Sequence, residues 1–370
     1  MAAPHGRGLL HLAAAVDQEA VHDVSDHGEL VRLAERGGFD FVTLGDTFAR
    51  PEPDALAVLA RIASTTTRIG LVPTVTVTHT EPFHLRAAVA TLDRVSRGRA
   101  GCRIDLSATE GGAGAWNFGR RPAASADASE QASEHDPVHE AGQVADLAAL
   151  PWDNRAVDAG AHDDASGRPV GPRDEARPAD FGGDTFPARG LPTVPRPSQG
   201  HPVTVVDATD RRARAAAARC ADVALVEGTN PAQVGSVRAE LHASALAHGR
   251  DPDELRVLAA LTVDLGDGER AAEPGHGGGG PRQTGQGPLY RGGPVDLAEL
   301  IASWHETGAA DGFHLTPAEP RRDLERLVNG TVALLQHRGL FRTFYPGSTL
   351  REHLGLTRPA KRYAVTREAP

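Results

Sequence analysis

The feature that most constrains this 370-residue sequence is a regular alternation of two hydrophobic periods. Short apolar runs of strand length are followed by longer segments in which apolar residues recur at helical spacing. Residues 71–101 contain one such unit: a strand rich in Thr and Val, a break at Glu81-Pro82, and an amphipathic helix that includes Leu85 and Val89. This alternation predicts βα units and a parallel sheet.

Repetition of this unit sets the expected fold. The expected strands are residues 9–16, 39–44, 68–76, 100–107, 202–206, 223–226, 255–265 and 312–315, and the expected helices are residues 25–36, 54–64, 82–95, 135–150, 211–221, 231–247, 295–307 and 322–338. Eight apolar strands, each suited to burial on both faces, favour an α/β fold of the closed (β/α)8 TIM-barrel type. An open doubly wound sheet is the alternative, but no GxGxxG turn follows the first or second strand.

Two irregular stretches interrupt the expected barrel domain of residues 1–338. Residues 153–200 are rich in Pro, Gly and Asp and form an insertion that is either a lid or partly disordered. Residues 266–293 contain the run GHGGGG and read as a flexible Gly-rich loop. Residues 339–370 form a C-terminal tail that we expect to pack on the barrel.

Composition excludes several classes of protein. The formal net charge is -10 with dispersed basic residues, which argues against a nucleic-acid partner. Cys102 and Cys220 lie far apart without a CxxC spacing, so neither a disulfide framework nor a cysteine metal site is expected. No apolar run reaches the roughly 20 residues of a membrane helix, and the N-terminal apolar run reads as a strand. We therefore expect a cytoplasmic protein.

Two segments carry a resemblance to a known family. THTEPFHLRAAVATLDRVSRGRAG (residues 78–101) and HRGLFRTFYPGSTLREHLGLTRP (residues 337–359) resemble the luciferase-like flavin monooxygenases, in particular the branch of nitrilotriacetate and dibenzothiophene-sulfone monooxygenases. The resemblance implies a luciferase-like barrel that uses reduced FMN as a co-substrate with O2 to oxidise a small organic molecule. It also implies a separate NAD(P)H:flavin reductase and a homodimer.

Two other functions remain open at this level. Some luciferase-like branches use the deazaflavin F420 for hydride transfer on the same barrel. A non-catalytic paralogue that binds flavin weakly or not at all is the third possibility.

The resemblance places candidate flavin contacts at the strand ends. Asp46 matches a flavin-contacting acid, whose carboxylate can accept hydrogen bonds from a ring N–H or a ribityl hydroxyl. Thr78 lies where the family contacts the isoalloxazine edge. His135 and His139 match an HxxxY pair whose members share one helix face and would approach a flavin phosphate or a substrate anion. A turn Asp, a strand Thr and a solvated helix face are the ordinary alternatives.

Two histidines are candidate acids or bases. His79 lies in the loop after the third strand, and His22 lies just beyond the first strand. An imidazole titrates near neutral pH, so either can transfer a proton, although an ordinary paired histidine is the competing interpretation. No metal site is expected, because the His135 and His139 pair has no third ligand at a suitable spacing.

The expected phosphate loop departs from the family pattern. The family places an AGxSxxG loop after the fifth strand, where backbone N–H groups bind the FMN phosphate. Here the loop lacks these glycines and carries Asp207 and Asp210. Thr209 can still donate a hydroxyl, and Arg211 and Arg212 can supply compensating charge.

The fourth strand also differs from the family's usual sequence. Its sequence RAGCRIDLS replaces the family's usual RAGWNVVTS, so that Cys102 and Arg103 stand in the expected lining. Arg103 and Asp105 fall on one face of the strand, where they either pair with each other or recognise a polar substrate.

Overall fold

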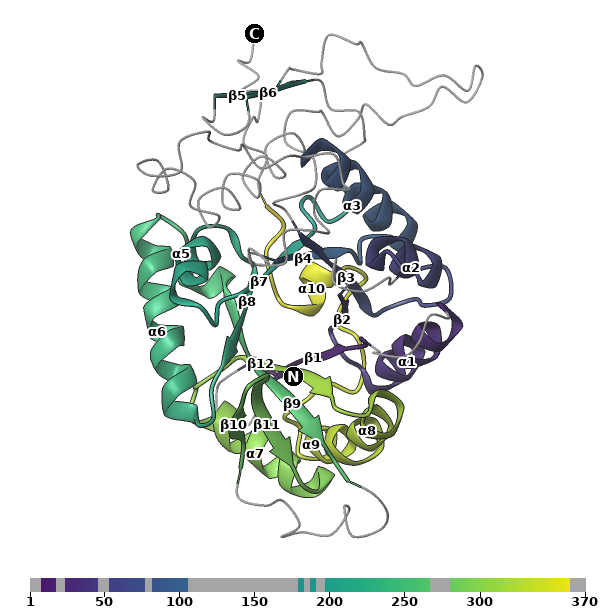
Figure 1. Cartoon of the computed structure of the whole chain (residues 1–370), viewed down its shortest axis with the longest axis vertical. Helices are drawn as coiled ribbons and strands as arrows, with labels where there is room; N and C mark the ends of the chain where they lie inside the picture. The colour runs from purple at the N-terminus through teal and green to yellow at the C-terminus, as the bar shows by residue number, and fades with distance from the viewer. Residues whose placement is uncertain are drawn as a thin grey trace, which may run out of the picture.

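Eight parallel strands close into a barrel (Figure 1) in the computed structural model, which describes residues 8–17, 24–45, 53–76, 82–105, 179–182, 187–190, 197–266 and 280–359. The barrel strands are β1 (His11–Ala15), β2 (Phe41–Leu44), β3 (Gly70–Thr76), β4 (Gly101–Asp105), β7 (Val203–Asp207), β8 (Val223–Glu227), β9 (Arg256–Asp264) and β12 (Gly312–Pro317). They pair in chain order, and β12 lies between β9 and β1 to close the ring. The predicted (β/α)8 barrel is confirmed.

Helices surround the barrel and follow the strands as the periodicity predicts. They are α1 (Val24–Gly37), α2 (Ala55–Ile62), α3 (Pro82–Ser96), α5 (Arg211–Cys220), α6 (Pro231–Ala247), α7 (Pro294–Glu306), α8 (Pro320–Arg326) and α9 (Ala333–His337), with a short turn of helix at Pro252–Glu254. Side-chain caps fix two of the starts, since Asp54 accepts from Ala57 N at 2.7 Å and Asn230 accepts from Gln233 N at 3.0 Å. The helix expected at residues 135–150 lies outside the described residues.

The last long helix is less regular than its sequence predicts. A π-helical segment, Leu327–Val332, separates α8 from α9. Within it the Thr331 hydroxyl donates to Pro294 O at 2.8 Å, and Gly330 packs so closely on Pro294 that a Cβ would lie 2.7 Å from the proline ring. This close contact with the start of α7 accompanies the local widening of the helix.

The Gly-rich loop expected at residues 266–293 is partly an ordered hairpin. Strand β10 (Arg282–Thr284) pairs antiparallel with β11 (Gly287–Arg291), and β11 continues the sheet beside the end of β9. The buried Tyr290 anchors β11, because its hydroxyl donates to Gly293 O at 3.1 Å. The glycines of residues 266–293 led to the prediction of a flexible loop. One of them, Gly287, has a φ of 96°, which suits the turn of the hairpin.

The insertion expected at residues 153–200 is described only in part. It contains a two-stranded antiparallel sheet of β5 (Ala179–Gly182) and β6 (Pro187–Gly190), and residues 197–200 lead into β7. The remainder of the insertion lies outside the described residues.

Two apolar cores stabilise the barrel. The larger one lies between the strands and the surrounding helices. The smaller one fills the lower barrel and contains Ala13, Phe41, Val72, Val203, Val205, Val223, Leu225, Leu258, Leu350, Leu354 and Leu356. Its last three members come from the C-terminal tail, which therefore supplies part of the barrel interior.

A short helix of the tail plugs one end of the barrel. Helix α10 (Leu350–His353) projects inside the ring of strands (Figure 1) and begins with a capping box between Thr349 and Glu352. A Cβ on Gly70 would lie 2.6 Å from Leu350 Cδ1, so glycine is required there for the plug to fit. Gly70 and Gly101 begin β3 and β4, which places the plug at the N-terminal end of the barrel.

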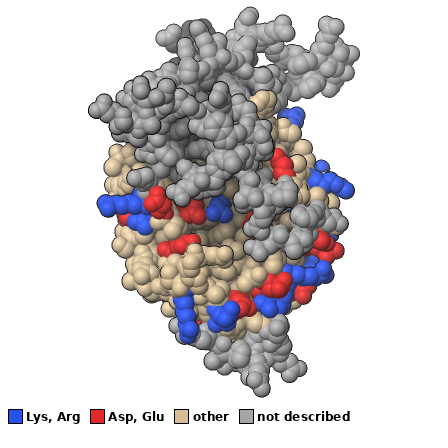
Figure 2. All heavy atoms as spheres, in the orientation of Figure 1, with Lys and Arg blue, Asp and Glu red and all other residues tan. Residues whose placement is uncertain are grey.

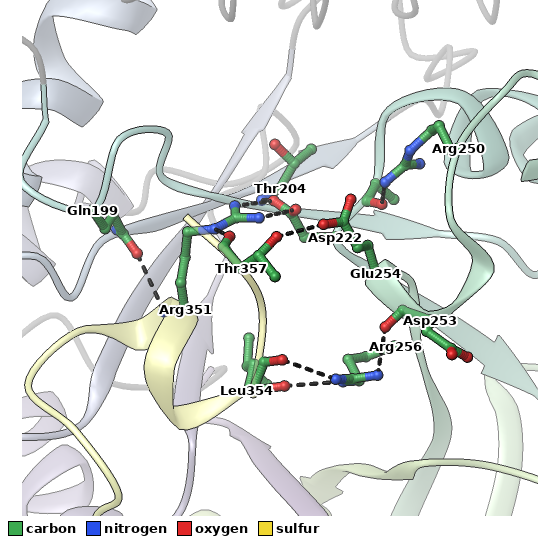
Figure 3. A network of polar contacts seen from close by, with 12 residues as sticks. Gln199, Thr204, Asp222, Arg250, Asp253, Glu254, Arg256, Arg351, Leu354 and Thr357 are labelled. Atoms are coloured by element: carbon green, nitrogen blue, oxygen red, sulfur yellow. Dashed lines mark hydrogen bonds and ion pairs between the residues drawn. The ribbon is translucent and has the colours of Figure 1, made fainter. Parts of the chain in front are cut away.

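Ion pairs hold this tail against the strands (Figure 3). The Arg351 guanidinium donates two hydrogen bonds to Asp222, at 3.0 and 2.9 Å, and Asp222 also accepts from Thr204 N. Arg256 donates to Leu354 O at 2.9 Å and Gly355 O at 3.1 Å. The tail thus binds β7, the start of β8 and the start of β9 through defined polar contacts.

A buried carboxylate fixes the other side of the tail. Asp40 is fully buried, accepts from Leu12 N at 2.8 Å, and pairs with Arg342 and His11. Burial alone would raise its pKa, but Arg342 and then His11 outweigh burial and lower the pKa to about 2. The carboxylate is therefore charged, and it ties the tail to β1 and β2.

The contact between Gly70 and Leu350 can be tested with a double-mutant cycle. Gly70→Ala should destabilise the fold by about 1–3 kcal/mol, because the new methyl group would lie 2.6 Å from Leu350 Cδ1 and 2.8 Å from Phe41 Cβ. Leu350→Ala should cost about 2–5 kcal/mol through the cavity that it leaves. In the double variant the methyl group at position 70 enters the cavity left by Leu350. The loss in free energy of unfolding, measured by urea denaturation, should therefore be at least about 1 kcal/mol smaller than the sum of the losses in the two single variants.

Gly285→Ala is the matched control, because a Cβ there meets no atom within 4 Å. It should leave the free energy of unfolding nearly unchanged. Strictly additive costs at Gly70 and Leu350 would contradict the proposed contact.

Candidate functional site

The open end of the barrel is opposite the plug. Because all eight barrel strands are parallel, their C-terminal ends meet at this mouth, where barrel enzymes carry their chemistry. The alternation of side chains along the strands places a set of polar residues between the apolar interior and the mouth: Thr43, Thr74, Arg103, Asp207, Glu227 and His314. We define these six residues as the mouth cluster.

The deepest members of the mouth cluster are His314 and Thr43. His314 Nε2 and Thr43 Oγ1 lie 2.8 Å apart and are buried. Burial, together with the charge of Arg103, lowers the pKa of His314 to about 3. A neutral imidazole therefore links β12 to β2 across β1, and it serves as a hydrogen-bond partner rather than as an acid at neutral pH.

An ion pair lies nearer to the mouth than His314 and Thr43. Arg103 Nη2 lies 3.0 Å from Asp207 Oδ2, which joins the ends of β4 and β7. Both side chains are partly exposed, at 27% and 41%, so the pair contributes little to stability and stays accessible from the mouth. The sequence left open whether Arg103 pairs with Asp105 or recognises a polar substrate; the side chain of Asp105 lies outside the described residues, and the described partner of Arg103 is Asp207. Cys102 points away from this face, and burial raises its pKa to about 12, which argues against a thiolate nucleophile.

Thr74 leaves a polar atom unsatisfied at the mouth. Its Oγ1 is buried and has no hydrogen-bond partner among the described residues. Nearby, Gly45 N donates to Asp17 Oδ1 at 2.5 Å, and a Cβ on Gly45 would lie 3.0 Å from that oxygen and 3.9 Å from Thr74 Oγ1. The three residues form a tight polar corner in which Thr74 Oγ1 is available to a ligand.

Glu227 adds a further carboxylate to the mouth. Burial, followed by the negative charge of Asp207, raises the pKa of Glu227. The β10–β11 hairpin lies against it, since a Cβ on Gly287 would lie 2.6 Å from Glu227 Oε1. The mouth therefore holds the acids Asp17, Asp207 and Glu227 together with Arg103.

The loop between β7 and α5 is closed by its own contacts. Asp207 Oδ1 accepts from Thr209 N at 3.0 Å, and Ala208 N donates to Leu225 O at 2.8 Å. Arg214 donates to Ala208 O at 3.2 Å, to Thr209 O at 3.3 Å and to Glu240 at 2.8 Å. These contacts occupy the backbone groups that begin the loop.

One predicted site residue can be placed. Thr209 lies in the loop after β7, beside the mouth cluster, as its sequence position predicts. The other candidates, His22, Asp46, Thr78, His79, His135 and His139, lie outside the described residues and stay predictions. Sequence reasoning missed Thr74, Glu227 and His314. Each falls on an inward position of a predicted strand, so the alternation of inward and outward side chains along the strand could have indicated them.

A hollow lies at the plugged end of the barrel, opposite the mouth. It has a volume of about 860 Å³ and is lined by residues of the N-terminal strand, the tail and the start of β9, including Arg238, Arg256, Arg342 and Phe344. The three arginines already bind Asp311, Leu354 O and Asp40, respectively. This hollow therefore belongs to the packing of the tail, and the mouth is the better candidate site.

Three features of other kinds of site are not found in the part that the structure describes. Arg and acidic side chains are interspersed on the face shown in Figure 2, without a broad area of one sign among the coloured residues. The described residues contain no group of three or more His, Cys, Asp or Glu suited to a metal ion. None of the described helices is long and apolar enough to cross a membrane.

Comparison with known proteins identifies relatives along most of the chain. Residues 6–108 and 172–327 match the family model for luciferase-like monooxygenases. The sequence is 29% identical to nitrilotriacetate monooxygenase component A of Aminobacter aminovorans, over 91% of each chain. It is 26% identical to dibenzothiophene-sulfone monooxygenase of Rhodococcus erythropolis, over 89% of each chain.

Solved structures agree on the fold. EDTA monooxygenase from Chelativorans sp. BNC1 superposes with a TM-score of 0.77 at 22% identity, covering 95% of this chain and 99% of that one. The F420-dependent tetrahydromethanopterin reductase of Methanopyrus kandleri is more distant, with a TM-score of 0.60 at 14% identity over 88% and 99% of the two chains.

The neutral state of His314 predicts how stability depends on pH. Its folded pKa of about 3 lies below the value of 6.5 for a free imidazole. Between these values the unfolded chain binds a proton that the folded chain does not, so stability is complete above about pH 6.5 and falls as the pH falls toward 3. His314→Gln should reduce this slope by up to about 1.4 kcal/mol per pH unit, measured by urea denaturation from pH 7 to pH 4.

His248→Gln, at an exposed position at the end of α6, is the control and should keep the parental slope. An unchanged slope in His314→Gln would show that His314 does not titrate in this way.

Proposed function

Because the chain belongs to the luciferase-like monooxygenase family, we propose that it is a flavin-dependent monooxygenase that uses reduced FMN and O2 to oxidise a small organic substrate. The observation that carries this proposal is the alignment of about nine-tenths of the chain with named monooxygenases. One of these relatives is named as component A, which supports a two-component system with a separate NAD(P)H:flavin reductase. We also propose a cytoplasmic homodimer.

The described residues fit one part of FMN better than another. The buried, unpartnered Thr74 Oγ1 at the end of β3 suits a polar edge of the flavin ring. The loop from Asp207 to Arg211 does not suit a phosphate dianion, because a carboxylate takes its Thr209 N–H. We therefore assign the ring to the mouth and do not assign the phosphate to this loop.

The roles of the protein are binding, orientation and exclusion of water. Reduced flavin supplies the reaction with oxygen when it is bound. Asp46, Thr78, His135, His139 and Thr209 are the proposed flavin contacts.

Proton transfer requires other groups. His22 and His79 are the proposed acid or base residues. His314 is not proposed for this role, because burial keeps it neutral far below neutral pH. The insertion of residues 153–200 is the proposed lid.

Two alternatives make different predictions for binding. An F420-dependent oxidoreductase on the same barrel would bind the deazaflavin and transfer hydride. Its solved examples share the fold at a lower TM-score than the monooxygenases do. A non-catalytic paralogue would bind no flavin.

Anaerobic titration separates these three functions. The purified protein is titrated with reduced FMN, oxidised FMN and F420, and binding is followed by fluorescence and by heat. Saturable micromolar binding of reduced FMN, lost in Asp46→Ala and His135→Ala, is the expected result. Binding of F420 alone would assign hydride transfer, and binding of none would assign a non-catalytic paralogue.

Thr74 provides a sharper test within the described mouth. Thr74→Val keeps the shape of the side chain and removes the hydroxyl, so reduced FMN should bind about tenfold more weakly, which corresponds to about 1.4 kcal/mol. Thr91→Val on α3 is the control, because that hydroxyl bonds only to Ala87 O in its own helix. Equal flavin affinity in both variants would remove Thr74 from the binding site.

A further inference from the structure

The charge at the mouth is unfavourable to a phosphate. Asp207 and Glu227 lie close enough that the charge of Asp207 raises the pKa of Glu227. Asp210 adds a carboxylate just before the first residue of α5. Arg103 faces these groups but is already paired with Asp207 at 3.0 Å. Among the described side chains, Arg103 and Asp207 neutralise each other, so a dianion placed here would meet the carboxylates of Glu227 and Asp210 without a free guanidinium from Arg103.

The backbone of the loop offers little compensation. Anion sites at helix starts use several free N–H groups. Here Thr209 N donates to Asp207 Oδ1, and Ala208 N donates to Leu225 O. A phosphate approaching the loop would therefore have to displace a carboxylate from Thr209 N.

Two neighbouring arginines differ in the contacts that their side chains make. Arg214 is held by the carbonyls of Ala208 and Thr209 and by Glu240. Arg211 is exposed at the first residue of α5 and stands next to Asp210. Arg211 and Asp210 are both exposed, so water and salt screen their charges alike, and Arg211 offsets the carboxylate beside it rather than adding a net positive charge.

A neutral hydroxyl group is better suited to this place than a phosphate. A neutral O–H can donate a hydrogen bond to Asp207 or to Glu227 without adding charge. Resting on the proposed flavin function, we infer that the mouth selects a flavin whose ribityl chain ends in a hydroxyl, so that riboflavin binds at least as tightly as FMN. Asp207 is the specificity-determining residue, because its carboxylate occupies both the Arg103 guanidinium and the Thr209 N–H, the two donors that a phosphate would need.

Direct comparison of the two flavins tests this inference. Dissociation constants of oxidised riboflavin and oxidised FMN are measured with the full chain by fluorescence quenching and calorimetry. We expect the constant for FMN to equal or exceed that for riboflavin. A tighter complex with FMN overturns the inference and leaves the proposed flavin function intact, whereas no binding of either flavin overturns both.

A charge variant and salt identify the cause. Asp207→Asn should tighten FMN about tenfold and change riboflavin by less than about threefold, and the retained riboflavin affinity reports that the site is folded. Asp253→Asn, an exposed acid at the opposite end of the barrel, is the matched control and should change neither constant. If Asp207→Asn leaves the ratio of the two constants unchanged, Asp207 is not the determinant.

Salt provides a measurement that needs no variant. Raising NaCl from about 0.05 M to about 0.5 M should tighten FMN relative to riboflavin, because salt screens repulsion between the phosphate and the carboxylates. Weaker FMN binding at high salt would indicate attraction to Arg211 and would overturn the inference.

Discussion

The contact between Leu350 and the glycines that begin β3 and β4 determines which end of this barrel can bind a ligand. A side chain at Gly70 would collide with Leu350, so the strands and the tail must be suited to each other. The apolar interior continues from the strands into Leu350, Leu354 and Leu356, and the N-terminal end is therefore filled by the chain itself. The polar strand ends at the C-terminal mouth are therefore the better candidate for chemistry among the described residues, and the ion pair of Arg351 with Asp222 holds the plug in place.

Polarity changes in steps along the barrel axis. The plugged end is apolar, the middle holds the neutral pair of His314 and Thr43, and the mouth holds Arg103 with Asp207. A neutral His314 follows from this order, because burial below and a guanidinium above both oppose its protonation. The same order lets charged groups stay near water, where the cost of burying them is small.

The sequence predicts the barrel well and the site only in part, for physical reasons. Long apolar strands and amphipathic helices are local patterns, so β1 to β4, β7 to β9 and β12 are all found close to their predicted positions. The hairpin that contains Tyr290 was missed because its stability comes from pairing with β9, which is a tertiary contact. The partner of Arg103 was missed for a similar reason: Asp207 is remote in sequence and adjacent only through the pairing of β4 with β7.

That pairing joins two departures from the family pattern that the sequence shows separately. The resemblance places Arg103 where the family usually has a neutral residue, and Asp207 at the start of the loop where it usually has glycines; in the fold the two are ion-pair partners. Both side chains are partly exposed, so the pair adds little stability, but each charge compensates the other at the mouth. Random loss of function does not require two remote positions to change to complementary charges. The pair therefore supports a mouth whose charges are matched to each other over a barrel that has lost its ligand, and this matching underlies the inferred preference for a flavin with a neutral tail.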